Sequence, residues 1–152
     1  GVDFKHNPEF TSLEVYETYG DYDTMRLLTQ QMIQDAATAV HGAPVARRAD
    51  ADGRVTEYDL SGTWPVKTVC QAVSEKLGEE ITADTPVEVL LRHADAIGLE
   101  LEPSVTWGVA LEEIYGELCE KTTTTPVFYT DFPKVNSPLT RQLRVDPRLA
   151  GK

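Results

Sequence analysis

The feature that most constrains this fold is a long helical repeat of apolar residues near the N-terminus. From residue 24 to residue 40, apolar side chains recur every three or four positions, which places them on one side of an α-helix. Gly42 and Pro44 then end the pattern, because neither residue continues a helix well. The repeat predicts one amphipathic helix over 24–40, with its apolar side against a second layer of structure. The apolar positions are Met25, Leu28, Met32, Ala36 and Val40.

Alternating apolar and polar residues on both sides of this helix predict β-strands. Such runs occupy residues 2–6, 10–16, 54–60 and 126–132, and the turn signal Asn7-Pro8 separates the first two. Helical patterns dominate the stretch between the third and fourth runs. This order of elements is typical of the α+β class, and we expect an antiparallel sheet with a helical insertion.

Three further helices are expected in the insertion. The first covers 66–77, the second begins with Thr85 and Pro86 as a cap and first-turn proline and ends at Gly98, and the third covers 107–120. We therefore divide the chain into a sheet and long helix at 1–60, a helical insertion at 61–121, and a returning strand with a basic tail at 122–152.

Charge is distributed unevenly along the chain. The 152 residues carry a net charge of −11, yet the segment 134–152 has five basic residues against the single acid Asp146. The remainder holds nine basic and 24 acidic groups, a net charge of −15. Such a surface repels phosphate backbones, so we expect no independent nucleic-acid binding and interpret the tail as solvated, with contact to tRNA as the alternative. The basic residues of the tail are Lys134, Arg141, Arg144, Arg148 and Lys152.

The two cysteines, Cys70 and Cys119, are isolated in the sequence. They form no CxxC pair, which favours reduced thiols in a cytoplasmic protein. The cysteines and the three histidines show no paired spacing, so we expect no metal site. No apolar run approaches the roughly 18 residues that a membrane span requires.

The run 10–16 carries the strongest chemical signal. In a strand, its aliphatic side chains Leu13 and Val15 would face the core, and the opposite face would gather a ring, a hydroxyl, a carboxylate and a phenol. Such a set suits a pocket for a cationic amine and a flat ring, although a half-solvated sheet often has a mixed polar face of this kind. The residues of that face are Phe10, Ser12, Glu14 and Tyr16.

Three stretches resemble class II lysyl-tRNA synthetases, in the same order along the chain. Residues 6–22 read HNPEFTSLEVYETYGDY and are similar to the segment that follows the second signature motif of that family. Residues 59–69, DLSGTWPVKTV, resemble in particular the bacterial form fused to a phosphatidylglycerol-lysylating membrane module. Residues 128–133 (FYTDFP) and 137–141 (SPLTR) resemble the strand and loop before the late ATP-site motifs. The resemblance spans the chain and implies an incomplete class II catalytic core.

The resemblance also implies roles for five residues. Glu14 and Tyr16 match the positions that recognise the lysine side chain, and Phe10 matches the ring that stacks on adenine. His6 lies where the family contacts the ATP phosphates, and Ser137 lies in a segment that the family brings near the active site. The implied chemistry forms lysyl-adenylate and pyrophosphate from lysine and ATP with Mg²⁺, then transfers lysine to tRNA. The complete enzyme would be a homodimer.

The departures from the family pattern are as informative as the matches. The first and third motifs, the motif-2 arginine and glutamate, and the late acidic Mg²⁺ ligands have no counterpart here, and no catalytic residue is assigned. Because phosphoryl chemistry needs cations placed around the reacting phosphorus, we expect this stretch alone to be inactive. We interpret it as a fragment of a lysine–tRNA ligase. The alternatives are a non-catalytic amino-acid-binding or regulatory module, and a paralogue that lysylates a protein or supplies lipid synthesis.

Overall fold

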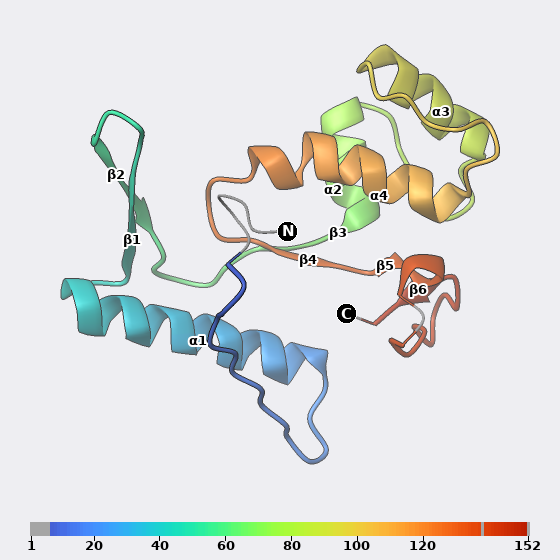
Figure 1. The fold of residues 1–152 in the computed structure, drawn as a ribbon. Coiled ribbons are helices and arrows are strands. Elements are labelled where there is room, and N and C mark those ends of the chain that lie inside the picture. Colours follow the sequence, from blue (N-terminus) through green and yellow to red (C-terminus); the bar gives the residue numbers. More distant parts are fainter. Residues whose placement is uncertain (1–6, 138, 152) are drawn as a thin grey trace.

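Helices and short strands alternate along the chain in the computed structural model, which describes residues 7–137 and 139–151 (Figure 1). The mixture confirms the α+β class. The elements, in order, are α1 (Tyr22–His41), β1 (Val45–Ala49), β2 (Val55–Asp59), β3 (Val66–Thr68), α2 (Val69–Leu77), α3 (Val87–Ala96), α4 (Trp107–Leu118), η1 (Glu120–Thr122), β4 (Phe128–Thr130), β5 (Phe132–Pro133), η2 (Lys134–Asn136) and β6 (Leu149–Ala150).

The hydrophobic core lies among α2, α3 and α4, which cluster on one side of the molecule (Figure 1). Leu90 of α3 is completely buried against α4, which contributes Leu111 and Ile114. The ring of Tyr115 extends this core toward the strands, because it meets Tyr129 edge-on with 5.1 Å between ring centroids. These aliphatic and aromatic contacts exclude water and hold the three helices as one unit.

Helix α1 confirms the long helix expected from the sequence and extends it slightly at both ends. Asp21 caps the first turn by accepting a hydrogen bond from the Thr24 amide, and Gly42 ends the helix in the left-handed conformation at φ 77°. None of the twenty helical residues is buried. Side-chain amides attach the helix instead, since Gln34 Nε2 donates to the Leu60 carbonyl over 2.7 Å and Gln30 Oε1 accepts from the Trp64 amide over 3.0 Å.

The strands form three separate two-stranded sheets in the described part of the chain. The β1–β2 hairpin is antiparallel, with Val45 opposite Asp59, and β5 and β6 also pair antiparallel. The pair β3–β4 is parallel, with Val66 opposite Phe128. The expectation of one antiparallel sheet therefore does not hold for these residues. The long helical connection between β3 and β4 makes the parallel pairing possible, because a parallel pair needs a crossover.

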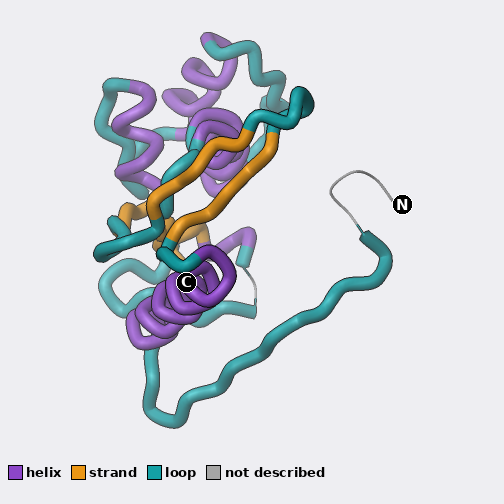
Figure 2. The backbone as a smooth tube through the Cα atoms, turned by 90° about the vertical axis from the view of Figure 1, so that its left-hand side faces the viewer, coloured by secondary structure: helices purple, strands orange, loops and turns teal. Residues whose placement is uncertain are grey.

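The predicted strand at 10–16 is wrong in the described structure. The segment has an extended backbone but no assigned strand, and it runs away from the other elements (Figure 2). No neighbouring strand in the described residues pairs with it, and an isolated run of alternating residues cannot form a sheet. The predicted strand at 2–6 lies outside the described residues.

Several element boundaries also differ from the predictions. Residues 66–68 form β3, and helix α2 begins after Thr68, whose side chain caps it. Pro86, rather than Thr85, occupies the N-cap of α3 and makes no side-chain cap. The strand expected at 126–132 is interrupted at Asp131, which adopts φ 61° and separates β4 from β5. Strand β1 was not predicted, although it pairs along its whole length with β2.

Candidate functional site

Glu14 and Tyr16 lie side by side on the segment that precedes α1. The Tyr16 hydroxyl donates a hydrogen bond to Glu14 Oε2 over 2.9 Å. Side chains two positions apart on an extended backbone project in the same direction, which is why the two groups meet even though no strand forms. The pair can present a carboxylate and a hydroxyl to a cationic amine.

Solvent surrounds this pair and the aromatic residue near it. Tyr16 is 87% exposed and Phe10 is 83% exposed, and Glu14 is also exposed. No aromatic ring stacks on Phe10 within the described part of the chain. An ion pair formed in such a position contributes only about 0–1 kcal/mol, because water and salt screen it. The described residues therefore place two lysine-recognition candidates together without enclosing them.

Ser137 lies in a different environment, at the end of η2. It is only 5% exposed, and its Oγ has no hydrogen-bond partner in the described structure. Its carbonyl accepts a hydrogen bond from Lys134 Nζ over 2.8 Å. Among residues 7–137 and 139–151, no hydrogen bond or ion pair joins it to Glu14, Tyr16 or Phe10, so the structure does not bring all the predicted site residues together. His6 lies outside the described residues.

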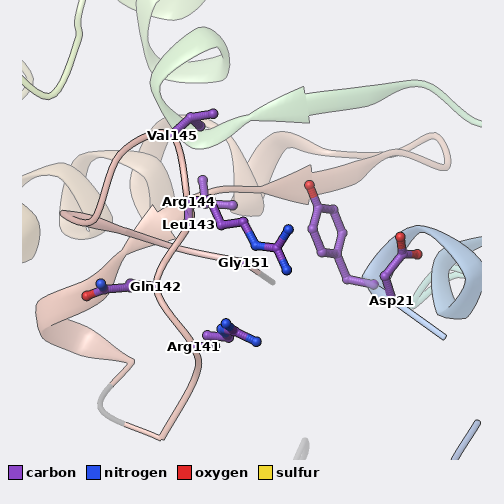
Figure 3. Close-up of a pocket in the computed structure, with 8 residues that line it drawn as sticks. Asp21, Arg141, Gln142, Leu143, Arg144, Val145 and Gly151 are labelled. Carbon is purple, nitrogen blue, oxygen red and sulfur yellow. The ribbon is translucent and has the colours of Figure 1, made fainter. Parts of the chain in front are cut away.

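A cavity of about 440 Å³ opens between the start of α1 and the loop that precedes β6 (Figure 3). Sequence reasoning did not find this site, because its two walls are some 120 residues apart in the chain. The only indication of this site in the sequence was the excess of basic residues in the segment 134–152. The lining residues are Asp21, Tyr22, Arg141, Gln142, Leu143, Arg144, Val145 and Gly151.

Acidic groups near α1 shape the electrostatics of one wall of this cavity. Burial raises the pKa of the Tyr22 hydroxyl, and the negative charges of Asp131, Asp23 and Asp21 raise it further against the opposing effect of Arg26. Tyr22 therefore keeps its proton at neutral pH and can donate a hydrogen bond. Burial also raises the pKa of the Asp131 carboxyl, with Asp23 as the second cause.

Neither a reactive thiol nor a metal site is found among the described residues. Burial raises the pKa of the Cys70 thiol to about 11, so little thiolate is present at neutral pH. Across residues 7–137 and 139–151, no three His, Cys, Asp or Glu side chains are grouped to hold a metal ion. In the same residues, no helix has both the length and the apolar character needed to cross a bilayer.

Comparison with known families gives a match over almost the whole chain. Residues 1–151 match the family described as tRNA synthetases class II (D, K and N). Similar proteins named lysylphosphatidylglycerol biosynthesis bifunctional protein LysX occur in Gordonia bronchialis, Mycobacterium marinum and Rhodococcus opacus. They are 51%, 48% and 45% identical, respectively, over all 152 residues of the chain. The chain spans only 13–14% of the length of these relatives.

Proposed function

Because this chain belongs to the class II tRNA synthetases of the D, K and N group, we propose that it contributes to the catalytic domain of a lysine–tRNA ligase. The observation that most favours lysine as the substrate is the hydrogen bond between Tyr16 and Glu14. A carboxylate held beside a phenol selects an ammonium group by charge and orients it by a second hydrogen bond. The relatives are named for the biosynthesis of lysylphosphatidylglycerol, a lysine-containing product, and this supports lysine as the substrate.

In this proposal each of the five candidate site residues has one role. Glu14 pairs with the lysine ammonium, Tyr16 fixes the direction of the amine, and Phe10 provides a flat surface for adenine. His6 contacts the ATP phosphates, and Ser137 lines the site from the opposite segment. The lysine carboxylate then displaces pyrophosphate from the α-phosphorus of ATP, and the resulting lysyl-adenylate passes lysine to tRNA.

Mg²⁺ accompanies ATP in this chemistry and supplies positive charge beside the phosphates. The described residues include no group of three carboxylates, histidines or cysteines that fits such an ion, and we assign it no ligand here.

We also propose that the 152 residues alone do not activate lysine. Glu14 and Tyr16 are open to water in the described structure, and selective binding of a cation needs a partly desolvated partner. The proposed organisation is the one expected from the sequence, with a sheet and long helix at 1–60, a helical insertion at 61–121 and a returning segment at 122–152. The buried core formed by α2–α4 supports the insertion as a unit.

Lysine-dependent ATP–pyrophosphate exchange tests this proposal. It should be measured on this chain and on a longer protein that contains it, each with and without the substitution Glu14→Gln. We expect exchange in the longer protein, a large rise in KM for lysine in the Glu14→Gln variant, and no exchange by the 152 residues alone. Unchanged lysine kinetics in that variant would remove Glu14 from the site.

A non-catalytic amino-acid-binding or regulatory module remains the second outcome of the same experiment. Lysine binding that depends on Glu14, without exchange in either protein, would favour that function over ligation.

A further inference from the structure

The apolar side of α1 faces away from the rest of the described structure. The helix is attached by its polar side, because the side chains of Gln30 and Gln34 hydrogen-bond to the backbone of residues 60–64. Residues two positions apart in an α-helix are about 200° apart around its axis. Leu28 and Met32 are each two positions from Gln30, so they lie on the opposite side of the helix from this attachment.

These two residues belong to a continuous apolar stripe that runs the length of α1. None of its members is buried, and Val40 at its end is 74% exposed. Helices α2, α3 and α4 each bury at least two of their residues, and Figures 1 and 2 show α1 apart from that cluster. An amphipathic helix normally packs its apolar side on other structure, and the described residues provide none for α1. The members of the stripe are Met25, Leu28, Met32, Ala36 and Val40.

The size of the stripe and the charge of the chain disfavour a second copy of this chain as the partner. A helix of twenty residues is about 30 Å long and about 10 Å wide, so the stripe offers roughly 300 Å² to a partner. A stable complex between two proteins buries about 800 Å² on each side. Two copies would also bring together chains that each carry a net charge of −11.

A surface within the same polypeptide can cover a stripe of this size, because the covalent connection keeps the two surfaces at a high effective concentration. The relatives contain ample chain for such a surface, since the 152 residues span only 13–14% of their length. The stripe has no charged side chain, so its partner must be apolar as well.

We infer that the apolar stripe of α1 is an intramolecular docking surface, which an aliphatic surface elsewhere in a longer polypeptide covers along the helix. The inference rests on the part of the proposed function that places this chain in a longer protein. It does not depend on lysine recognition by Glu14.

Cysteine labelling of the 152-residue chain and of the longer protein tests the inference. Met32→Cys places a thiol in the stripe, and mass spectrometry of the labelled peptides distinguishes it from Cys70 and Cys119. We expect a maleimide to modify position 32 at least about tenfold more slowly in the longer protein than in the short chain, because a covered thiol reacts only when the contact opens. This protection should not change with protein concentration, since the contact is intramolecular.

The matched control is Thr38→Cys in the same helix. Thr38 is exposed and lies two positions from Ala36 and from Val40, which places it off the stripe. Its labelling rate should agree to within about twofold in the two proteins, because no covering surface is expected there.

Urea unfolding of Met32→Lys provides a second measurement. In the longer protein this lysine would be buried without a partner and should lower the urea midpoint. In the 152 residues alone it would remain in water and should leave the midpoint unchanged. The control Thr38→Lys should leave both midpoints unchanged.

Equal labelling of position 32 in the two proteins would overturn the inference. Labelling of the short chain that slows as its concentration rises would also overturn it, because a second copy would then cover the stripe. Protection of position 32 in a longer protein that lacks lysine-dependent exchange would reject the ligase function and still support the docking surface.

Discussion

Gly108 of α4 lies so close to Val135 of η2 that no side chain fits between them. A β-carbon at Gly108 would lie 2.5 Å from Val135 Cγ1 and 2.8 Å from Pro133 Cβ. This contact holds the segment that leads to Ser137 against the helical core. The placement of that segment therefore requires a residue without a side chain at position 108.

Replacing Gly108 with alanine should therefore destabilise the protein by about 1–3 kcal/mol, since the new methyl group would displace the fully buried Pro133 as well as the more exposed side chain of Val135. Urea unfolding measures the effect. The matched control is Gly116→Ala in the same helix, where a β-carbon meets nothing within 4 Å, and it should be stabilising by up to about 1 kcal/mol. Equal effects at the two positions would contradict the close packing of α4 on η2.

Phe10→Ala should mainly affect the use of ATP if the proposed function is correct. Removing the ring removes a stacking surface for adenine worth about 1–3 kcal/mol, which corresponds to a rise in KM for ATP of roughly 5- to 150-fold. The KM for lysine should change little. Steady-state exchange measurements on the longer protein separate the two constants, and an equal loss for both substrates would point to misfolding instead.

The ion pairs of Arg148 should contribute to stability in a pH-dependent way. Arg148 pairs with Asp146 over 2.7 Å and with Asp84 over 2.6 Å, and its hydrogen bonds hold the pKa of Asp146 below the ordinary value of 3.8. Because the folded-state pKa is depressed, this stabilisation is present above about pH 4 and is lost as the pH falls through the folded-state pKa.

Urea midpoints of the wild type and of Arg148→Gln check this expectation. The wild type should be the more stable at about pH 6, and the difference should narrow as the pH falls toward 3. If the stability difference between the two proteins instead grew as the pH fell, the ion pair of Arg148 with Asp146 could not be its source, because protonation of Asp146 weakens that pair.

Cys70 and Cys119 should resist alkylation in the folded protein. Burial raises the pKa of Cys70 to about 11 and also raises that of Cys119, whereas the thiolate is the reactive form. Iodoacetamide labelling at about pH 8, followed by mass spectrometry, should be at least about tenfold slower than in unfolding concentrations of urea. Rapid labelling of the folded chain would show that the thiols are more accessible than their environment implies.

Local signals predicted α1 well, whereas pairing between distant residues could not be foreseen. The capping residue Asp21 and the terminal Gly42 act within one turn of the helix, so the sequence around them is sufficient. Residues 10–16 have the alternation of a strand, but a strand needs a partner, and the pattern carries no information about one. The parallel register of Val66 with Phe128 likewise depends on the whole intervening chain.

The same distinction applies to the candidate sites. Glu14 and Tyr16 are two positions apart, so the prediction that they share a face required only the geometry of an extended backbone. The cavity between Tyr22 and Arg141 arises from tertiary packing, and composition could indicate only that the tail is basic.

The parallel pair β3–β4 also has a consequence for the order in which the chain folds. Val66 and Phe128 are 62 positions apart, yet their strands lie side by side and make only three residue pairs. Helices α2–α4 can form from nearby contacts, while joining these strands must first overcome the entropy of closing a long loop. We therefore expect the helical unit to gain protection from hydrogen exchange early in refolding, and the β3–β4 seam to be among the last parts of the molecule to close.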